Sequence, residues 1–200
     1  MIKKKKRNSW FIFLLIVIAW TGCRENPRPV KTMGKGGETI YSNQTSLQTE
    51  LQLPDGTKLM MDSATIIRLR AGFNQGNRDL YLEGEAIFRV DPSGVKPFVV
   101  HTRALLTAVL DTSPAIFKIY GYPASPGEEV DLFAGNLKVT KSYHSETDNE
   151  PVILRAGEMA MVNTDIDLME KEKLDSAELR SGMLSPKGIC SPVFGGTNKD

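Results

Sequence analysis

Leu80-Tyr81-Leu82-Glu83-Gly84-Glu85-Ala86-Ile87-Phe88-Arg89-Val90 is the stretch that decides the fold, because every second residue in it is apolar or glycine. Such an alternation predicts a strand with one buried and one exposed face. Gly84 in the middle of the strand predicts a bend or a close approach of another backbone. Glu83 and Glu85 share the exposed face, where we expect them to be solvated or paired with an arginine rather than to act as a catalytic pair.

Similar alternating runs and turn signals surround this strand, and residues 38–164 show no convincing apolar repeat of helical period. Asp55 and Gly56 supply the turn chemistry of a first hairpin. The apolar face changes across Gly135, which predicts a bulge or a tight turn. Gly157 lies in another turn between two apolar runs. We therefore expect an all-β domain over residues 38–165, either a sandwich or a short solenoid-like roll of antiparallel strands.

The N-terminal residues indicate export. Five of the first seven residues are basic, and an uncharged apolar run follows from Trp10 to Trp20. A helix of this length spans about 17 Å, which is shorter than the ~30 Å hydrocarbon core of a bilayer. The pattern therefore predicts a signal peptide over residues 1–22. The alternative is a single membrane helix that anchors a periplasmic domain in the inner membrane.

The run ends in Trp20-Thr21-Gly22-Cys23, which resembles a bacterial lipobox, in which the cysteine is acylated and becomes the first residue of the mature chain. Trp20 departs from the aliphatic residue that normally stands at its position. We expect lipidation of Cys23, attachment to the membrane through it, and a flexible tether over residues 23–37. Residues 166–200 are charged and then rich in Gly, Pro and Asn, so we expect a short, flexible or weakly helical tail.

Composition argues against several classes of protein. A net charge of +1 over 200 residues is untypical of a nucleic-acid-binding protein. Two Cys and two His are too few for a structural zinc site, which normally needs four such ligands. The sequence contains no phosphate-binding loop, no nucleophile elbow and no zinc-protease motif. We therefore expect no catalytic residues, no cofactor, no metal and no nucleic-acid partner.

Four motifs in a fixed order point to a family: Leu53-Pro54-Asp55-Gly56-Thr57, the strand over residues 80–90, Pro97-Phe98-Val99-Val100-His101-Thr102, and Leu154-Arg155-Ala156-Gly157-Glu158. This order resembles the periplasmic domain of the FecR family, the transmembrane regulators of extracytoplasmic-function sigma factors in iron and glycan uptake. Glu85 and Phe88 match the family pattern L-x-G-E-A-x-F-x-V, and Phe98 matches P-F-x-V-x-T. The resemblance covers about residues 40–165.

The chain departs from the family pattern in two motifs and at both ends. Ala156 replaces the usual proline, and residues 111–114 stand where the family prefers Gly-Thr and a strand. Family members carry a cytoplasmic segment of many tens of residues that grips the sigma factor, whereas nine residues precede Trp10 here. The family's C-terminal subdomain should begin near residue 180. We therefore expect the β domain alone, without the anti-sigma segment and most of the C-terminal subdomain.

Two functions follow from this resemblance. The first is a non-enzymatic signalling module in the periplasm, which binds the signalling domain of a TonB-dependent transporter or a FecR homologue. The alternative is a generic all-β lipoprotein with a structural, assembly or ligand-binding role, because a fold does not fix a function.

Overall fold

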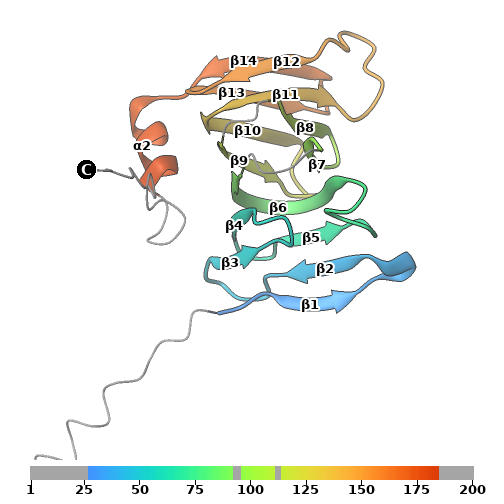
Figure 1. Ribbon diagram of the computed structural model, residues 1–200. Helices are drawn as coiled ribbons and strands as arrows, with labels where there is room; N and C mark the ends of the chain where they lie inside the picture. Colours follow the sequence, from blue (N-terminus) through green and yellow to red (C-terminus); the bar gives the residue numbers. More distant parts are fainter. Residues whose placement is uncertain (1–26, 92–95, 111–113, 185–200) are drawn as a thin grey trace, which may run out of the picture.

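The computed structural model describes residues 27–91, 96–110 and 114–184. Almost all of the regular structure in these residues is strand (Figure 1). The elements are β1 (Val30–Met33), a 3-10 turn (Lys35–Gly37), β2 (Thr39–Ser42), β3 (Thr49–Gln52), β4 (Lys58–Met61), β5 (Ile66–Leu69), β6 (Arg78–Val90), β7 (Phe98–His101), β8 (Leu105–Val109), β9 (Ala115–Gly121), β10 (Gly127–Ala134), β11 (Asn136–Lys141), β12 (Val152–Arg155), β13 (Glu158–Asn163), β14 (Leu168–Lys173) and helix α2 (Ser176–Leu184). The prediction of an all-β fold followed by a weakly helical tail is confirmed. The described residues contain no helix with the length and apolar character needed to cross a membrane.

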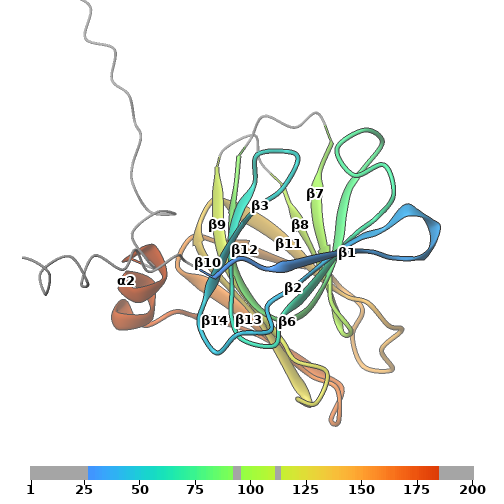
Figure 2. The same cartoon turned by 90° about the horizontal axis from the view of Figure 1, so that it is seen from below.

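The strands form one hydrogen-bonded sheet that divides into two parts. We call one part sheet A, made of β1, β2, β5, the first half of β6, β7, β8, β11 and β12. The other part is sheet B, made of β3, β4, the second half of β6, β9, β10, β13 and β14. Figures 1 and 2 show the strands stacked from β1 to β14, with the two sheets facing each other. The fold thus combines the facing sheets of a sandwich with the stacking of a roll.

Strand β6 joins the two sheets. Its first half pairs with β5 and β7, and its second half pairs with β4 and β9 from Gly84 onward. One pair departs from the predicted antiparallel pattern, because β6 and β7 run parallel. The reason is topological: β6 ends in sheet B at Val90, and the chain starts β7 at Phe98, beside Arg78 at the beginning of β6 in sheet A.

The core lies between the two sheets. Along β6 every second residue from Arg78 to Val90 is buried, as the alternation predicts. Three phenylalanines meet at its centre: the ring of Phe88 stacks on Phe117 at 5.1 Å and meets Phe98 edge-on at 6.2 Å. Each fully buried side chain of this size contributes roughly 1.5–3 kcal/mol to folding, so the aromatic cluster is a main source of stability.

Paired structure extends beyond residues 38–165 at both ends. Strand β1 lies inside the predicted tether and pairs with β2, although all four of its side chains are exposed. Strand β14 lies inside the predicted tail and pairs with β13, again with mostly exposed side chains. Both strands pair through their backbones at an edge, which leaves no apolar alternation in the sequence to reveal them. The signal peptide, Cys23 and Cys190 lie outside the described residues.

Candidate functional site

Asp55 of the first hairpin turn forms a buried ion pair with the first residue of β6. Arg78 donates a hydrogen bond from Nε to Oδ2 of Asp55 at 2.9 Å, and its Nη2 lies 2.8 Å from the same oxygen in the ion pair. Both side chains are at most 5% exposed. The Arg78 guanidinium also lies 5.3 Å from the centre of the Phe98 ring. Thr57 donates to Asp55 from its backbone N and from its hydroxyl, which holds the turn beside Gly56. Asp55, Phe98 and Phe88 are therefore connected in the interior, since Arg78 contacts both Asp55 and Phe98, and Phe98 contacts Phe88.

Gly84 lies at the corner where β6 passes from sheet A to sheet B. Its φ of +112° belongs to a region that L side chains rarely adopt, and a Cβ there would lie 2.6 Å from Oγ1 and 2.8 Å from Cα of Thr65. Thr65 bridges this corner, because its hydroxyl donates to the carbonyl of Glu85 and accepts from the N–H of Glu85. Glycine is therefore required here by both conformation and space.

Gly135 and Gly157 occupy two further turns. Gly135 joins β10 to β11 directly after a bulge in β10, and a Cβ there would lie 3.1 Å from Cα of Ala115. Gly157 lies in the turn between β12 and β13, where its N–H donates to the carbonyl of Leu132. Both positions shape the corners between the sheets rather than a binding site.

Glu85 differs from the other family-motif residues, because its side chain lies on the outer face of sheet B. Glu83 and Glu85 do not share a face as the sequence predicts, since the corner at Gly84 sends them to different sheets. Glu83 pairs with Arg68 on sheet A. Glu85 instead lies beside Tyr120 of β9, next to three further ionisable residues.

These residues form what we call the carboxylate cluster: Glu85, Lys118, Glu129 and Asp131. Lys118 of β9 is the cation at its centre, with Nζ 2.9 Å from Oδ2 of Asp131 and 3.9 Å from Oε1 of Glu129. Asp131 is almost fully buried, and its Oδ1 has no hydrogen-bond donor within the part of the chain that the structure describes. Sequence reasoning missed this group, because the pairing of β9 with β10 brings Lys118 opposite Asp131.

Burial and like charge shift the ionisation of the cluster. Burial, reinforced by the charges of Asp62 and Asp131, raises the pKa of Glu85, although Lys118 opposes this. Burial, together with the neighbouring carboxylate of Asp131, raises the pKa of Glu129 to about 7. Burial disfavours the charge on Lys118, but hydrogen bonding to Asp131 and the surrounding carboxylates outweigh it and raise its pKa. The cluster therefore favours the charged form of its lysine and makes the carboxyls of Glu85 and Glu129 harder to ionise.

The cluster is part of a larger acidic face. Two adjacent rows of residues cross the outer face of sheet B, and together they carry six carboxylates, one lysine and several apolar side chains. The rows are Glu50, Met60, Ile87, Lys118, Asp131, Met159 and Glu172, and then Glu85, Tyr120, Glu129, Met161 and Glu170. In the described residues no three acidic, His or Cys side chains are placed to hold a metal ion. The two rows therefore carry an excess of negative charge.

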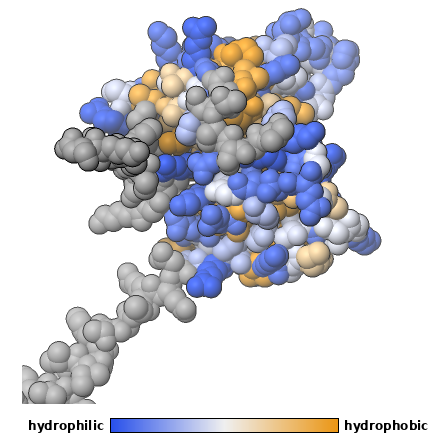
Figure 3. Space-filling view, in the orientation of Figure 1, coloured by the Kyte–Doolittle hydropathy of each residue, from blue (hydrophilic) through white to orange (hydrophobic). Residues whose placement is uncertain are grey.

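Exposed apolar side chains gather at the β12–β14 end of the roll. Figure 3 shows a hydrophobic area at this end and a mainly hydrophilic surface below it. Four of the exposed large apolar residues come from these strands and the turn between β13 and β14, namely Ile153, Met161, Ile166 and Leu168. Met161 also belongs to the acidic face, so the apolar and acidic surfaces adjoin each other.

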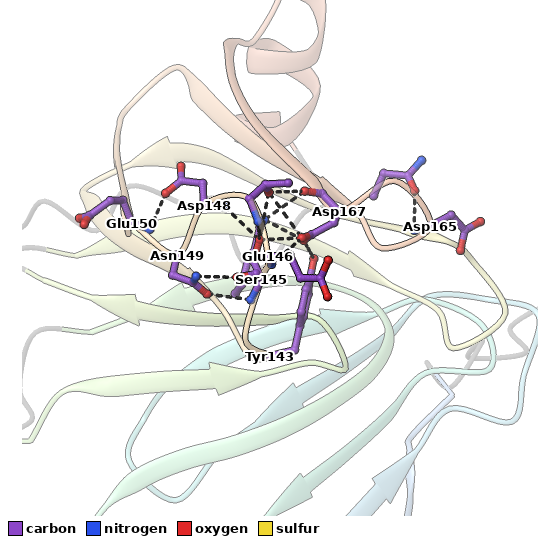
Figure 4. A network of polar contacts seen from close by, with 11 residues as sticks. Tyr143, Ser145, Glu146, Asp148, Asn149, Glu150, Asp165 and Asp167 are labelled. Carbon is purple, nitrogen blue, oxygen red and sulfur yellow. Dashed lines mark hydrogen bonds and ion pairs between the residues drawn. The ribbon is translucent and has the colours of Figure 1, made fainter.

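A polar network fixes the loop between β11 and β12 to the turn between β13 and β14 (Figure 4). Asp167 is its centre: its carboxylate accepts hydrogen bonds from Lys141 Nζ and the Tyr143 hydroxyl at 3.0 Å and from the Ser145 hydroxyl at 2.8 Å. The backbone N–H of Glu146 donates to the same carboxylate. These donors hold the pKa of Asp167 well below its usual range. The hydrogen bond from Ser145 has the largest effect, and that from Lys141 has the next largest.

Comparison with known proteins places the chain in a family. Residues 39–138, half of the chain, match the family model described as FecR protein. The chain therefore belongs to the FecR family, as its motifs predict. No match was found among curated proteins.

Two solved structures share the fold, and both are crystal structures of a protein from Parabacteroides distasonis ATCC 8503 described as a candidate anti-sigma factor. The first has a TM-score of 0.62 at 25% identity and aligns with 74% of this chain. The second has a TM-score of 0.61 at 25% identity and aligns with 73% of this chain. The alignments cover 65% of each solved chain, which is less than two thirds of its length.

Proposed function

We propose that this protein is a non-enzymatic regulatory module that transmits a signal by binding a protein partner in the bacterial envelope. The observation that carries the proposal is its membership of the FecR family over residues 39–138. The likeness to a candidate anti-sigma factor supports it. The partner is the signalling domain of a TonB-dependent transporter or a second FecR-family protein. Lipidation of Cys23 holds the module at the membrane on the periplasmic side.

The outer face of sheet B is the contact surface in this proposal. Its carboxylates outnumber its cations, and its apolar residues include Met161, which is 39% exposed. A partner segment that carries Lys or Arg beside apolar residues complements such a face in charge and in character. Electrostatic attraction of this kind speeds association and makes binding sensitive to salt.

The test is a titration of the full chain, in detergent, against the N-terminal signalling domain of a TonB-dependent transporter encoded beside it. We expect saturable binding that weakens as salt is added. The paired change Glu170→Lys and Glu172→Lys reverses two exposed charges on β14 and should weaken binding at least about tenfold, which is about 1.4 kcal/mol. Lys138→Glu, on the outer face of sheet A, is the matched control and should leave binding unchanged.

Two results would count against the proposal. Absence of binding up to high micromolar concentration, to both the transporter domain and a FecR homologue, would favour the generic lipoprotein with a structural or assembly role. Equal losses of affinity in the β14 variant and the Lys138 control would show that the outer face of sheet B is not the contact surface.

A further inference from the structure

The orphaned oxygen of Asp131 is the starting point of this inference. Asp131 lies on the outer face of sheet B with a side chain only 5% exposed. Lys118 Nζ lies 2.9 Å from Oδ2, but no group in the described residues donates to the buried Oδ1. A buried carboxylate oxygen without a donor is unfavourable, because it has lost its hydrogen bonds to water, so native structures rarely leave one unpaired. A neighbouring carboxyl in its protonated form can supply this donor.

Glu129 is in the right place to supply it. Glu129 and Asp131 are two residues apart on β10, so their side chains share one face. Two ionised carboxylates cannot hydrogen-bond to each other, whereas a protonated carboxyl donates to a carboxylate. Lys118 cannot neutralise both, because its Nζ lies 3.9 Å from Oε1 of Glu129, beyond hydrogen-bond distance.

We propose that Glu129 stays protonated up to about neutral pH and that its carboxyl O–H donates a hydrogen bond to Oδ1 of Asp131. Loss of this proton adds one negative charge to the outer face of sheet B and strengthens the docking of a basic partner segment. The docking half of this inference rests on the proposed function. Burial and the contact with Asp131, which raise the pKa of Glu129 to about 7, support the protonated state. The periplasmic face would then respond to pH changes near neutrality.

The charged and titratable groups around Glu129 favour this state on balance. Among the residues that the structure describes, one cation faces it, and the other ionisable neighbours are acidic or phenolic. They are Glu85 on β6, Lys118 and Tyr120 on β9, Asp131 on β10, Glu170 on β14 beyond Met161, and Glu178 on α2. The β13 neighbour opposite Glu129 is the uncharged Met161. Deprotonation thus places a new charge among carboxylates, with Lys118 as the neighbouring cation.

The first test needs no partner. In the full chain with carboxyl carbons labelled with carbon-13, the Glu129 signal should titrate with a midpoint near 7, and Glu129→Gln should remove that transition. Asp131→Asn removes a like charge and should lower the midpoint by about one unit or more. Glu172→Gln, a change to an exposed residue on the same face, should leave it unmoved. A Glu129 midpoint near 4.5, or one that Asp131→Asn does not shift, would overturn the proposal.

A second partner-free measurement follows from linkage. Because the pKa of Glu129 is higher in the folded state than the usual 4.5, its contribution to stability is complete below pH 4.5 and is lost as pH rises through about 7. The unfolding midpoint in urea should therefore fall between pH 5 and pH 8 in the unchanged chain. It should fall less in Glu129→Gln, and equal declines in both would contradict the proposal.

The docking half is tested with the transporter signalling domain. Binding to the unchanged chain should be at least threefold tighter at pH 8 than at pH 6, and Glu129→Gln should abolish this difference. An equal pH difference in both chains would refute the coupling. Binding at neither pH would refute the proposed function instead, while the carbon-13 titration would still decide the protonation of Glu129.

Discussion

Arg78 and Asp55 lie 23 residues apart in the sequence and form a buried ion pair that joins the first hairpin turn to the start of β6. The Arg78 guanidinium also donates to the carbonyls of Lys96 and Asp91, at 3.3 and 3.4 Å. The turn, the two ends of the long strand and the segment before β7 therefore meet at one cation. The family-motif turn is needed for the fold because it supplies the counter-charge of Arg78.

Arg78→Met should lower the free energy of unfolding by about 3–5 kcal/mol, because it leaves the Asp55 carboxylate buried without its cation. Urea unfolding followed by circular dichroism measures the loss. Arg68→Met is the matched control: it breaks the pair with Glu83, whose side chains are 34% and 40% exposed, and should cost no more than about 1 kcal/mol. Equal losses of unfolding free energy in the two variants would show that the buried pair stabilises the fold no more than the exposed pair does.

Gly84→Ala should destabilise the protein by more than about 2 kcal/mol, because it combines a positive φ with a clash against the backbone of Thr65. Two glycines separate these causes. Gly72→Ala meets an unfavourable φ in open space and should cost about 1 kcal/mol. Gly76→Ala meets neither and should change stability by at most about 0.5 kcal/mol. A Gly84→Ala loss no larger than that of Gly72→Ala would refute the close-contact argument.

The alternating pattern was sufficient to predict β6, its buried face and the corner at Gly84. The buried alternation begins at Arg78, two residues before Leu80. A charged residue at that position predicts the end of a strand rather than a buried side chain. Its burial depends on Asp55 from another hairpin, and only the assembled sheet reveals that contact. Sequence reasoning therefore identified Asp55 as a turn residue and missed its role as a counter-ion.

The carboxylate cluster shows the same limit more strongly. Glu129 and Asp131 are visible in the sequence as acidic residues on one strand face, but the register of β9 against β10 decides that Lys118 lies between them.

Edge strands pose a different problem. All four side chains of β1 are exposed, so its pairing with β2 leaves no hydrophobic pattern to detect.

Cys23→Ser should abolish membrane attachment through lipid. We expect the mature wild-type chain to begin at Cys23 and to carry several acyl chains, because a single chain binds a bilayer only marginally. In the variant, the protein should either leave the membrane fraction or remain as an uncleaved precursor at the inner membrane. Intact mass and membrane fractionation measure both outcomes. A variant with unchanged mass and partitioning would favour the membrane-helix alternative.

Asp167→Asn should loosen the loop between β11 and β12, because the Asp167 carboxylate accepts from Lys141, Ser145 and the Glu146 backbone. Amide exchange at Glu146 should become several-fold faster, whereas Asp165→Asn in the same turn should leave it unchanged. The donors lower the pKa of Asp167, so its stabilising effect is present above the usual value of 3.8 and is lost as pH falls below it. Protection of Glu146 relative to intrinsic exchange should therefore persist at pH 5 and decline in stronger acid. Equal protection in Asp167→Asn and the unchanged chain at pH 5 would show that this carboxylate does not hold the loop.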